Sequence, residues 1–222
     1  RKEMGILPPG DIRNCLIALA QEERGLADML AYRFPEPGAL AGHNMGNILM
    51  AGLTYKAEGD FAQAVEDLSR VLAVQGRVLP VTLDNVTICA TMADGTVIQG
   101  ETDIVADERE IEEVFLEPAD CQPVEAALKA IREADYILLG PGSLYTSLIS
   151  NLLVPGVVEA IRASNATVYY LCNVATQSGE MEMNKASDYV RIMMKYVGKD
   201  LIQRVVVNDA ILDGTVQEII AM

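Results

Sequence analysis

The stretch GPGSLYTS, at residues 140–147, contains the residue types from which proteins build phosphate sites. Gly140 and Gly142 allow positive φ values and close approach of a phosphate, and Ser143 stands where a helix N-cap is expected. Unpaired amides and the positive end of a helix dipole attract phosphate without a basic side chain. The stretch therefore predicts an anion site, although an ordinary strand-to-helix turn uses the same residues.

A second polar stretch, CNVATQSGE at residues 172–180, follows another apolar run. Asn173, Thr176 and Gln177 offer hydrogen-bond donors and acceptors that suit a base, a ribose or a sugar, and they also suit a plain loop. Both polar stretches follow predicted buried strands, so we expect them at the carboxyl ends of a sheet, where open α/β folds bind ligands.

Two further polar stretches, PPGDIRN and GHNMGN, lie in the first quarter of the chain. Asp11 and Arg13 form either an ion pair that closes a turn, or a base or metal ligand beside a phosphate contact. His43 is the only histidine, and we place it with Gly46 and Asn47 on one helical face. A lone histidine there is more often a core or capping group than a catalyst, and no Ser-His-Asp arrangement is evident.

Standard nucleotide loops are absent. The GxGxxG pattern that starts at Gly140 fails at its third glycine, where Tyr145 stands, and no GxxxxGK[ST] loop occurs. The sequence therefore predicts neither a classical dinucleotide loop nor a Walker loop.

Composition excludes several classes of partner. The chain carries 17 basic and 32 acidic residues, a formal charge of −15, which disfavours nucleic acid. No apolar run approaches the roughly 18 residues of a membrane span, and no signal peptide is evident, so we expect a cytoplasmic protein. The four cysteines have no metal spacing, and we expect them buried and reduced.

The first half of the chain predicts helices followed by a hairpin. Asp11 and Asp60 each stand where a helix N-cap is expected. The pair Asp94-Gly95 separates two strand-like runs and predicts a β-hairpin. The expected elements are helices at 11–20, 26–32, within 40–60 and after 60, and strands at 86–92, 96–104 and 113–116.

The second half alternates between helix and strand. A helix at 123–134 precedes a fully buried strand at 136–139, and further elements follow: helices from 144 and from 155, a strand at 168–172, a helix at 186–197 and a strand at 204–208. This rhythm predicts an α/β fold with a parallel sheet and the β-hairpin as an insertion. We expect one domain over residues 1–222 that lacks its native N-terminal strand and glycine-rich loop.

The motifs PPGDIRNCL, AGHNMGN, VLAVQGRVLPVTLDNVTICA, GPGSLYTSLISNLLVPGV and CNVATQSGE, in this order, resemble the YvcK family of gluconeogenesis factors, which are distant relatives of the transferase CofD. The resemblance implies a Rossmann-like three-layer parallel sheet. It also implies a cytoplasmic protein that binds UDP-sugars such as UDP-N-acetylglucosamine and supports cell-wall morphogenesis on gluconeogenic carbon sources. Relatives usually begin with GGGTG and an Asp-Asp-Gly-Gly-Ser-Ser-Gly segment, which this chain does not contain.

These motifs supply our candidate ligand-binding residues: Gly10, Asp11, Arg13, Asn14, His43, Asn44, Asn47, Gly140, Pro141, Gly142, Ser143, Tyr145, Thr146, Ser147, Asn173, Thr176 and Gln177. No catalytic or metal-ligating residue and no cofactor is assigned. The leading hypothesis is a UDP-sugar-binding regulator without turnover. The alternatives are a CofD-like phospho-lactyl transferase acting on a deazaflavin precursor and, by fold analogy alone, an NAD-dependent dehydrogenase. A homo-oligomer remains open.

Overall fold

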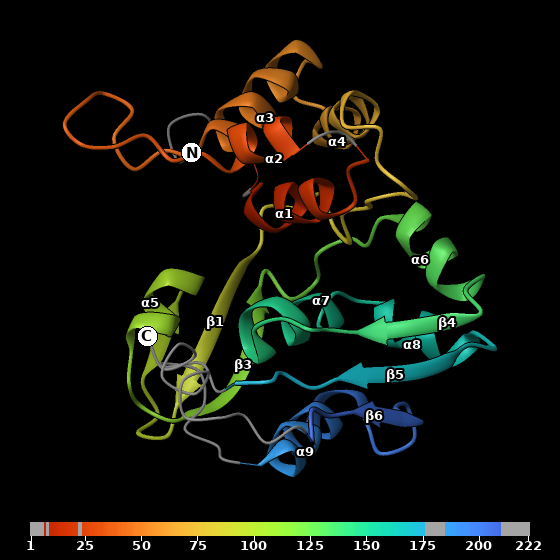
Figure 1. Cartoon of the computed structure of the whole chain (residues 1–222). Helices are drawn as coiled ribbons and strands as arrows, with labels where there is room; N and C mark the ends of the chain where they lie inside the picture. Colours follow the sequence, from red (N-terminus) through yellow and green to blue (C-terminus); the bar gives the residue numbers. More distant parts are fainter. Residues whose placement is uncertain (1–6, 8, 22–23, 176–184, 210–222) are drawn as a thin grey trace. The chain divides into compact units, whose positions relative to one another are not determined.

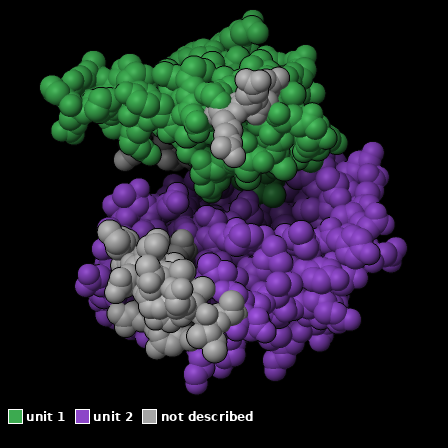
Figure 2. All heavy atoms as spheres, in the orientation of Figure 1, with its two compact units in different colours: residues 1–85 green, residues 86–222 purple. Residues whose placement is uncertain are grey.

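The computed structural model describes residues 7, 9–21, 24–175 and 185–209 (Figure 1). Helices and strands alternate along the chain, so the predicted α/β class is confirmed. The chain divides into two compact units, residues 1–85 and residues 86–222, which Figure 2 colours separately. The expectation of a single domain stays a prediction.

Residues 1–85 form a helical unit around one apolar core. Its helices are α1 (Gly10–Ala18), α2 (Arg24–Ala31), α3 (Met45–Lys56) and α4 (Phe61–Val71). The side chains that face inward share one cluster: Leu16, Leu30, Met50, Phe61, Val65, Leu68 and Leu72. The cluster takes residues from all four helices, so burial of apolar surface holds them together.

At the helix starts of this unit, the structure confirms one expectation from the sequence and contradicts two. Asp60 caps α4 as expected, because its carboxylate accepts a hydrogen bond from the amide of Gln63 at 2.9 Å. Asp11 is not the cap of α1, which begins after Pro9 and places Asp11 inside its first turn, where a negative charge favours the helix dipole. His43 precedes α3 and is exposed, so it does not share a helical face with Gly46 and Asn47.

Residues 86–222 begin with an antiparallel sheet in the order β2-β1-β3. The strands are β1 (Thr87–Met92), β2 (Val97–Gln99) and β3 (Ile111–Glu117). The predicted hairpin is present, since Cys89 pairs with Gln99 and Thr91 with Val97. Its second strand is shorter than expected: Gly100 takes a φ of +94°, and residues 101–104 belong to helix α5 (Glu101–Ala106). Acidic residues in the first turn of α5 favour a helix there.

A salt-bridged turn stabilises this hairpin. The carboxylate of Asp94 accepts a hydrogen bond from the amide of Thr96 at 2.9 Å, and Arg109 bridges Asp94 and Asp107. The bonds to Thr96 and then to Arg109 lower the pKa of Asp94 to about 2. Asp94 therefore stays charged at neutral pH and fixes the turn.

The second sheet is parallel, in the order β4-β5-β6. Its strands lie side by side in Figure 1: β4 (Tyr136–Leu139), β5 (Thr167–Leu171) and β6 (Arg204–Val206). The remaining helical segments are α6 (Glu125–Arg132), η1 (Leu144–Ile149), α7 (Ser150–Leu152), α8 (Val157–Ala163) and α9 (Ala186–Val197). Strands β4 and β5 and helix α9 lie within one residue of their predicted bounds.

One face of β4 is exposed, so the expectation of a fully buried strand is wrong. Tyr136 is 68% exposed and Leu138 is 60% exposed. In the neighbouring strand, Val168 and Tyr170 are buried and pair with Ile137 and Leu139. A period of two in burial indicates a strand covered on one face, whereas apolar residue types alone do not distinguish one covered face from two.

Cysteine exposure differs from expectation at one position. Cys89, Cys121 and Cys172 are buried as predicted, whereas Cys15 on α1 is exposed, and all four are free thiols.

In the described part of the chain, no single helix is long and apolar enough to cross a membrane. The bent pair Leu144–Leu152 and Val157–Ala163, at 69°, passes that test only when both helices are taken together.

Helix α9 covers the outer edge of β3. The amide of Val114 donates to the hydroxyl of Tyr196 at 2.8 Å, and the ammonium of Lys195 donates to the carbonyl of Glu112 at 2.6 Å. Edge strands carry unpaired amides and carbonyls, and these two side chains satisfy one of each. Because α9 also contacts η1, it joins the antiparallel sheet to the segment that follows β4.

We expect Tyr196→Phe to lower the free energy of unfolding by about 1–3 kcal/mol, because the buried amide of Val114 would lose its acceptor. Tyr55→Phe is the matched control, since Tyr55 is 57% exposed, and it should change stability by less than about 0.5 kcal/mol. Urea-induced unfolding followed by circular dichroism measures both. Equal stabilities of the two variants would show that α9 does not protect the edge of β3.

Candidate functional site

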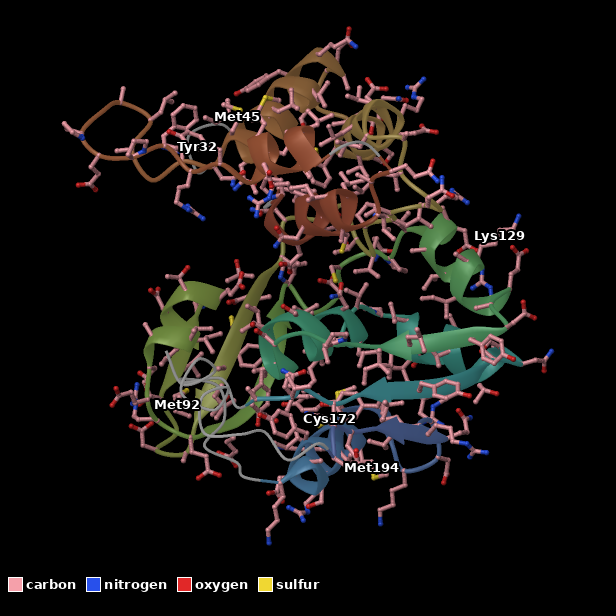
Figure 3. All side chains as sticks on the ribbon, in the orientation of Figure 1. Tyr32, Met45, Met92, Lys129, Cys172 and Met194 are labelled. Carbon is pink, nitrogen blue, oxygen red and sulfur yellow. The ribbon has the colours of Figure 1, made fainter. Side chains whose placement is uncertain are left out.

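Two loops meet at the carboxyl edge of the parallel sheet. Strands β4 and β5 run in the same direction with Leu139 paired to Tyr170, so the chain leaves both strands at the same edge. Residues 140–143 and residues 172–175 therefore lie next to one another, as the sequence predicted. Cys172, labelled in Figure 3, is the first residue after β5.

The side chain of Asn173 connects the two loops. Its Nδ2 donates to the carbonyl of Gly142 at 2.9 Å, and its Oδ1 lies 3.5 Å from the amide of Gly142, which donates to it. Both ends of the side-chain amide thus contact the backbone of one residue, Gly142, in the neighbouring loop. Asn173 positions the GPGS loop, and its contact with a ligand stays a prediction.

Gly140, and not Gly142, is the conformationally demanding glycine. Gly140 has a φ of +93°, and a Cβ at this position would lie 2.8 Å from the carbonyl oxygen of Leu171. Gly142 lies outside the left-handed region, and its Cβ would sit in ordinary contact, 3.4 Å from the Cβ of Ser147. Of the two glycines that allow positive φ, only Gly140 uses it.

The helix after the loop begins with a wide turn. The carbonyl of Ser143 accepts from the amide of Ser147 at 3.1 Å and from that of Leu148 at 2.9 Å, and η1 is a π-helical segment that continues into α7. Ser143 occupies the N-cap position as predicted, but its hydroxyl makes no capping hydrogen bond. That hydroxyl can therefore contact a ligand.

Side chains that follow the loop, and others at the end of β5, are buried. Tyr145 and Thr146 are 4% and 7% exposed, so both belong to the core rather than to an open surface. Burial raises the pKa of the Tyr170 phenol and of the Cys172 thiol. Neither group is ionised at neutral pH, so neither provides an anionic nucleophile under the loop.

A second group of predicted residues comes together in residues 1–85. The guanidinium of Arg13 donates to the side-chain oxygen of Asn47 at 2.6 Å and to that of Asn14 at 2.7 Å. Asn44 caps α3 by accepting from the amide of Asn47 at 3.1 Å, and its Nδ2 donates to the carbonyl of Ala31 at 2.9 Å. The stretches PPGDIRN and GHNMGN thus form one polar cluster on α1 and α3.

Other predicted residues lie around this cluster without joining its hydrogen bonds. Gly10 is the first residue of α1, and no ion pair forms between Asp11 and Arg13. The main-chain carbonyl of His43 accepts from the amide of Phe34 at 2.9 Å, while its side chain is exposed. The structural reading of Asp11 and Arg13 as a closing ion pair is therefore wrong.

Comparison with known proteins gives the family. Residues 1–219 match the family described as 2-phospho-L-lactate transferase CofD. The gluconeogenesis factor of Halalkalibacterium halodurans is 43% identical over 217 residues, which cover 98% of this chain and 67% of that protein. The gluconeogenesis factor of Bacillus subtilis is 42% identical over 208 residues, which cover 94% of this chain and 65% of that protein.

A solved structure agrees with these matches. The crystal structure of protein BH3568 from Bacillus halodurans has a TM-score of 0.93 and 43% identity, and covers 100% of this chain and 71% of that chain. The chain belongs to the CofD family. The resemblance to gluconeogenesis factors is thereby confirmed. This CofD family chain spans 67% of the relative from Halalkalibacterium halodurans and 62% of the putative gluconeogenesis factor of Thermotoga maritima.

The sequence analysis named most residues of the two adjoining loops and of the polar cluster on α1 and α3. It missed Arg33 and the role of Gly46, although it placed Gly46 on the right helix. Arg33 lies next to Asn44 through an isolated bridge, which connects residues eleven positions apart and has no local sequence signal. Thr176 and Gln177 lie outside the described residues. Over the described ranges, no group of three or more His, Cys, Asp or Glu side chains could hold a metal ion.

We expect Gly140→Ala to destabilise the protein, because the left-handed conformation costs about 1–2 kcal/mol for a residue with a Cβ, and contact with the carbonyl of Leu171 adds to that cost. Gly142→Ala is the matched control and should stay within about 0.5 kcal/mol of the wild type. Urea-induced unfolding measures both. A Gly140→Ala protein of unchanged stability would contradict the assigned loop conformation.

Proposed function

We propose that the protein is a regulator that binds a UDP-sugar, such as UDP-N-acetylglucosamine, and does not turn it over. In this proposal it acts in the cytoplasm and supports growth and cell-wall morphogenesis on gluconeogenic carbon sources. The name gluconeogenesis factor, carried by relatives that are 42% and 43% identical, supports the metabolic part. In this proposal the fold is a Rossmann-like three-layer sheet with the β1–β2 hairpin as an insertion.

The observation that carries the proposal is the hydrogen-bonded pair of Asn173 and Gly142. This pair fixes a glycine loop at the carboxyl edge of a parallel sheet before any ligand binds. A loop fixed in advance loses less conformational entropy on binding than a loose one. The segment from Tyr136 to Gly156 contains no charged residue, so a phosphate there would be held by backbone amides and by hydroxyls such as that of Ser143.

The same geometry favours binding over turnover. Catalysis requires groups that interact more strongly with the transition state than with the bound substrate. Burial keeps the phenol of Tyr170 and the thiol of Cys172, at the end of β5, neutral, and the amide of Asn173 is committed to the loop. These groups support the shape of a binding site, but they are not placed to accept or donate a proton at a phosphate.

A CofD-like phospho-lactyl transferase is the second candidate, because the matched family is described by that activity. In this candidate the protein transfers a phospho-lactyl group to a deazaflavin precursor. The two candidates differ in the product: a regulator releases its UDP-sugar unchanged, whereas a transferase releases a nucleotide.

We expect the intact protein to bind UDP-N-acetylglucosamine in calorimetric titration and to release no UDP from it under single-turnover conditions. A ligand concentration of one hundred times Kd should raise the free energy of unfolding by about 2.7 kcal/mol. Turnover of lactyl-diphospho-guanosine, without binding of the UDP-sugar, would favour the transferase.

The variant Asn173→Asp tests the role of the loop. It replaces the donor to the Gly142 carbonyl by a negative charge, so UDP-sugar affinity should fall about tenfold, the equivalent of about 1.4 kcal/mol. Asn165→Asp adds the same charge at an exposed position of the same unit and should leave affinity unchanged. Circular dichroism checks that both variants are folded. Equal UDP-sugar affinities of the two variants would show that the loop is not part of the binding site.

A further inference from the structure

We propose that Arg13 and Arg33 form a binding site for a phosphate group in residues 1–85. Both guanidinium groups belong to the polar cluster at the start of α3, and Arg33 is absent from the residues that the sequence predicted. The site is argued from its own contacts and does not depend on the proposed nucleotide-sugar site of the GPGS loop.

Arg13 is held in place by neutral partners. Its two described acceptors are the side-chain oxygens of Asn47 and Asn14, at 2.6 and 2.7 Å, and both belong to uncharged amides. Its Nε–H is buried and finds no acceptor among the described residues. A guanidinium has five N–H donors, so these contacts fix the side chain and leave donors free, while no carboxylate of the described residues forms an ion pair with it.

Gly46 provides the space that this arrangement requires. A Cβ at position 46 would lie 2.7 Å from the Cδ of Arg13 and 2.7 Å from the carbonyl oxygen of Leu30. The aliphatic part of Arg13 therefore runs directly over the first turn of α3. Any side chain at position 46 would displace Arg13 or the end of α2, so the residues of α2 and α3 hold Arg13 in a fixed position.

Arg33 reaches the same end of α3 from the segment after α2. Residue 33 forms a bridge with Asn44, and the amide of Met45 donates to the carbonyl of Tyr32 at 2.9 Å, which places Tyr32 beside Met45 in Figure 3. The guanidinium of Arg33 donates to the carbonyl of Gly42 at 2.6 Å and is exposed. Arg33 therefore enters the cluster with a neutral partner, as Arg13 does.

The positive charge of Arg33 acts on Arg13. Burial and then the charge of Arg33 lower the pKa of Arg13, and the opposing effect of Asp11 is the smallest of the three. Neither arginine forms an ion pair with a carboxylate of the described residues. A bound dianion would relieve this repulsion.

Phosphate is the anion that this chemistry fits. The planar fork of a guanidinium matches two phosphate oxygens, and two such groups can share one phosphoryl group. The net charge of −15 repels anions from the rest of the surface, so two arginines without carboxylate partners are a local exception. A partly buried arginine with a purely structural role is normally paired with a carboxylate. Arg13 has only uncharged acceptors, which is unusual for such a role.

The test is a calorimetric titration of the intact protein with inorganic phosphate at constant ionic strength, supported by ³¹P line broadening. Arg33→Gln removes the exposed member of the pair and should weaken phosphate binding about tenfold or more. Arg13→Lys keeps the charge but loses the fork, and it should also weaken binding. Arg191→Gln is the control, because it makes the same charge change at an exposed arginine of α9 and should leave phosphate binding within about twofold.

Titration of the same variants with UDP-N-acetylglucosamine identifies the source of the phosphate. If Arg33→Gln weakens UDP-N-acetylglucosamine binding as much as it weakens phosphate binding, the site holds the phosphates of the nucleotide. If the affinity for UDP-N-acetylglucosamine is unchanged, the site holds a separate phosphorylated metabolite. Phosphate affinity that is undetectable in the folded wild type, or equal in the wild type and Arg33→Gln, would overturn the proposal. Because free phosphate is the probe, the result does not depend on whether the GPGS loop binds a UDP-sugar.

Discussion

The parallel pairing of β4 with β5 is the constraint on which the candidate ligand site depends. It brings the ends of two strands to one edge, where the carbonyl of Leu171 leaves no room for a Cβ at residue 140. The chain can turn there only through a residue that tolerates positive φ, and Gly140 supplies it. Asn173, two residues beyond β5, then fixes the peptide of Gly142, and the chain enters a wide π-helical turn with Ser143 at its start.

The GPGS loop and the polar cluster at the start of α3 differ in charge. The loop after β4 is neutral and can hold an anion only through amides and hydroxyls, whereas the cluster around α3 presents two guanidinium groups. Backbone amides recognise the shape of a phosphate at short range, and arginines also attract it over a longer distance that depends on salt. In a chain of charge −15, attraction of an anionic ligand depends more on the second kind of contact.

The sequence predicted features that depend on local interactions better than features that depend on contacts between distant residues. Periodic apolar residues and a local cap predicted α4, α9, β4 and β5 closely, because these signals lie within each segment. Residues 101–104 were read as a continuation of the second hairpin strand, but the strand ends at Gly100, whose φ is positive, and helix α5 follows. Arg13 was recognised from its motif, but Arg33 enters the cluster through a bridge to Asn44, which only the tertiary fold creates.

Family membership narrows the function without deciding it, because the CofD family name denotes a transferase and the relatives are called gluconeogenesis factors. One fold can carry both roles, so the distinction lies in what surrounds the bound phosphate. Next to the GPGS loop, Asn173 is bonded to the loop itself, and burial raises the pKa of Tyr170 and Cys172 at the end of β5. In the function we propose, backbone amides and hydroxyls of the loop would hold the phosphate, and contacts that bind the ground and transition states equally give affinity but no rate acceleration. On this proposal, the loop would serve to sense a metabolite and not to convert it.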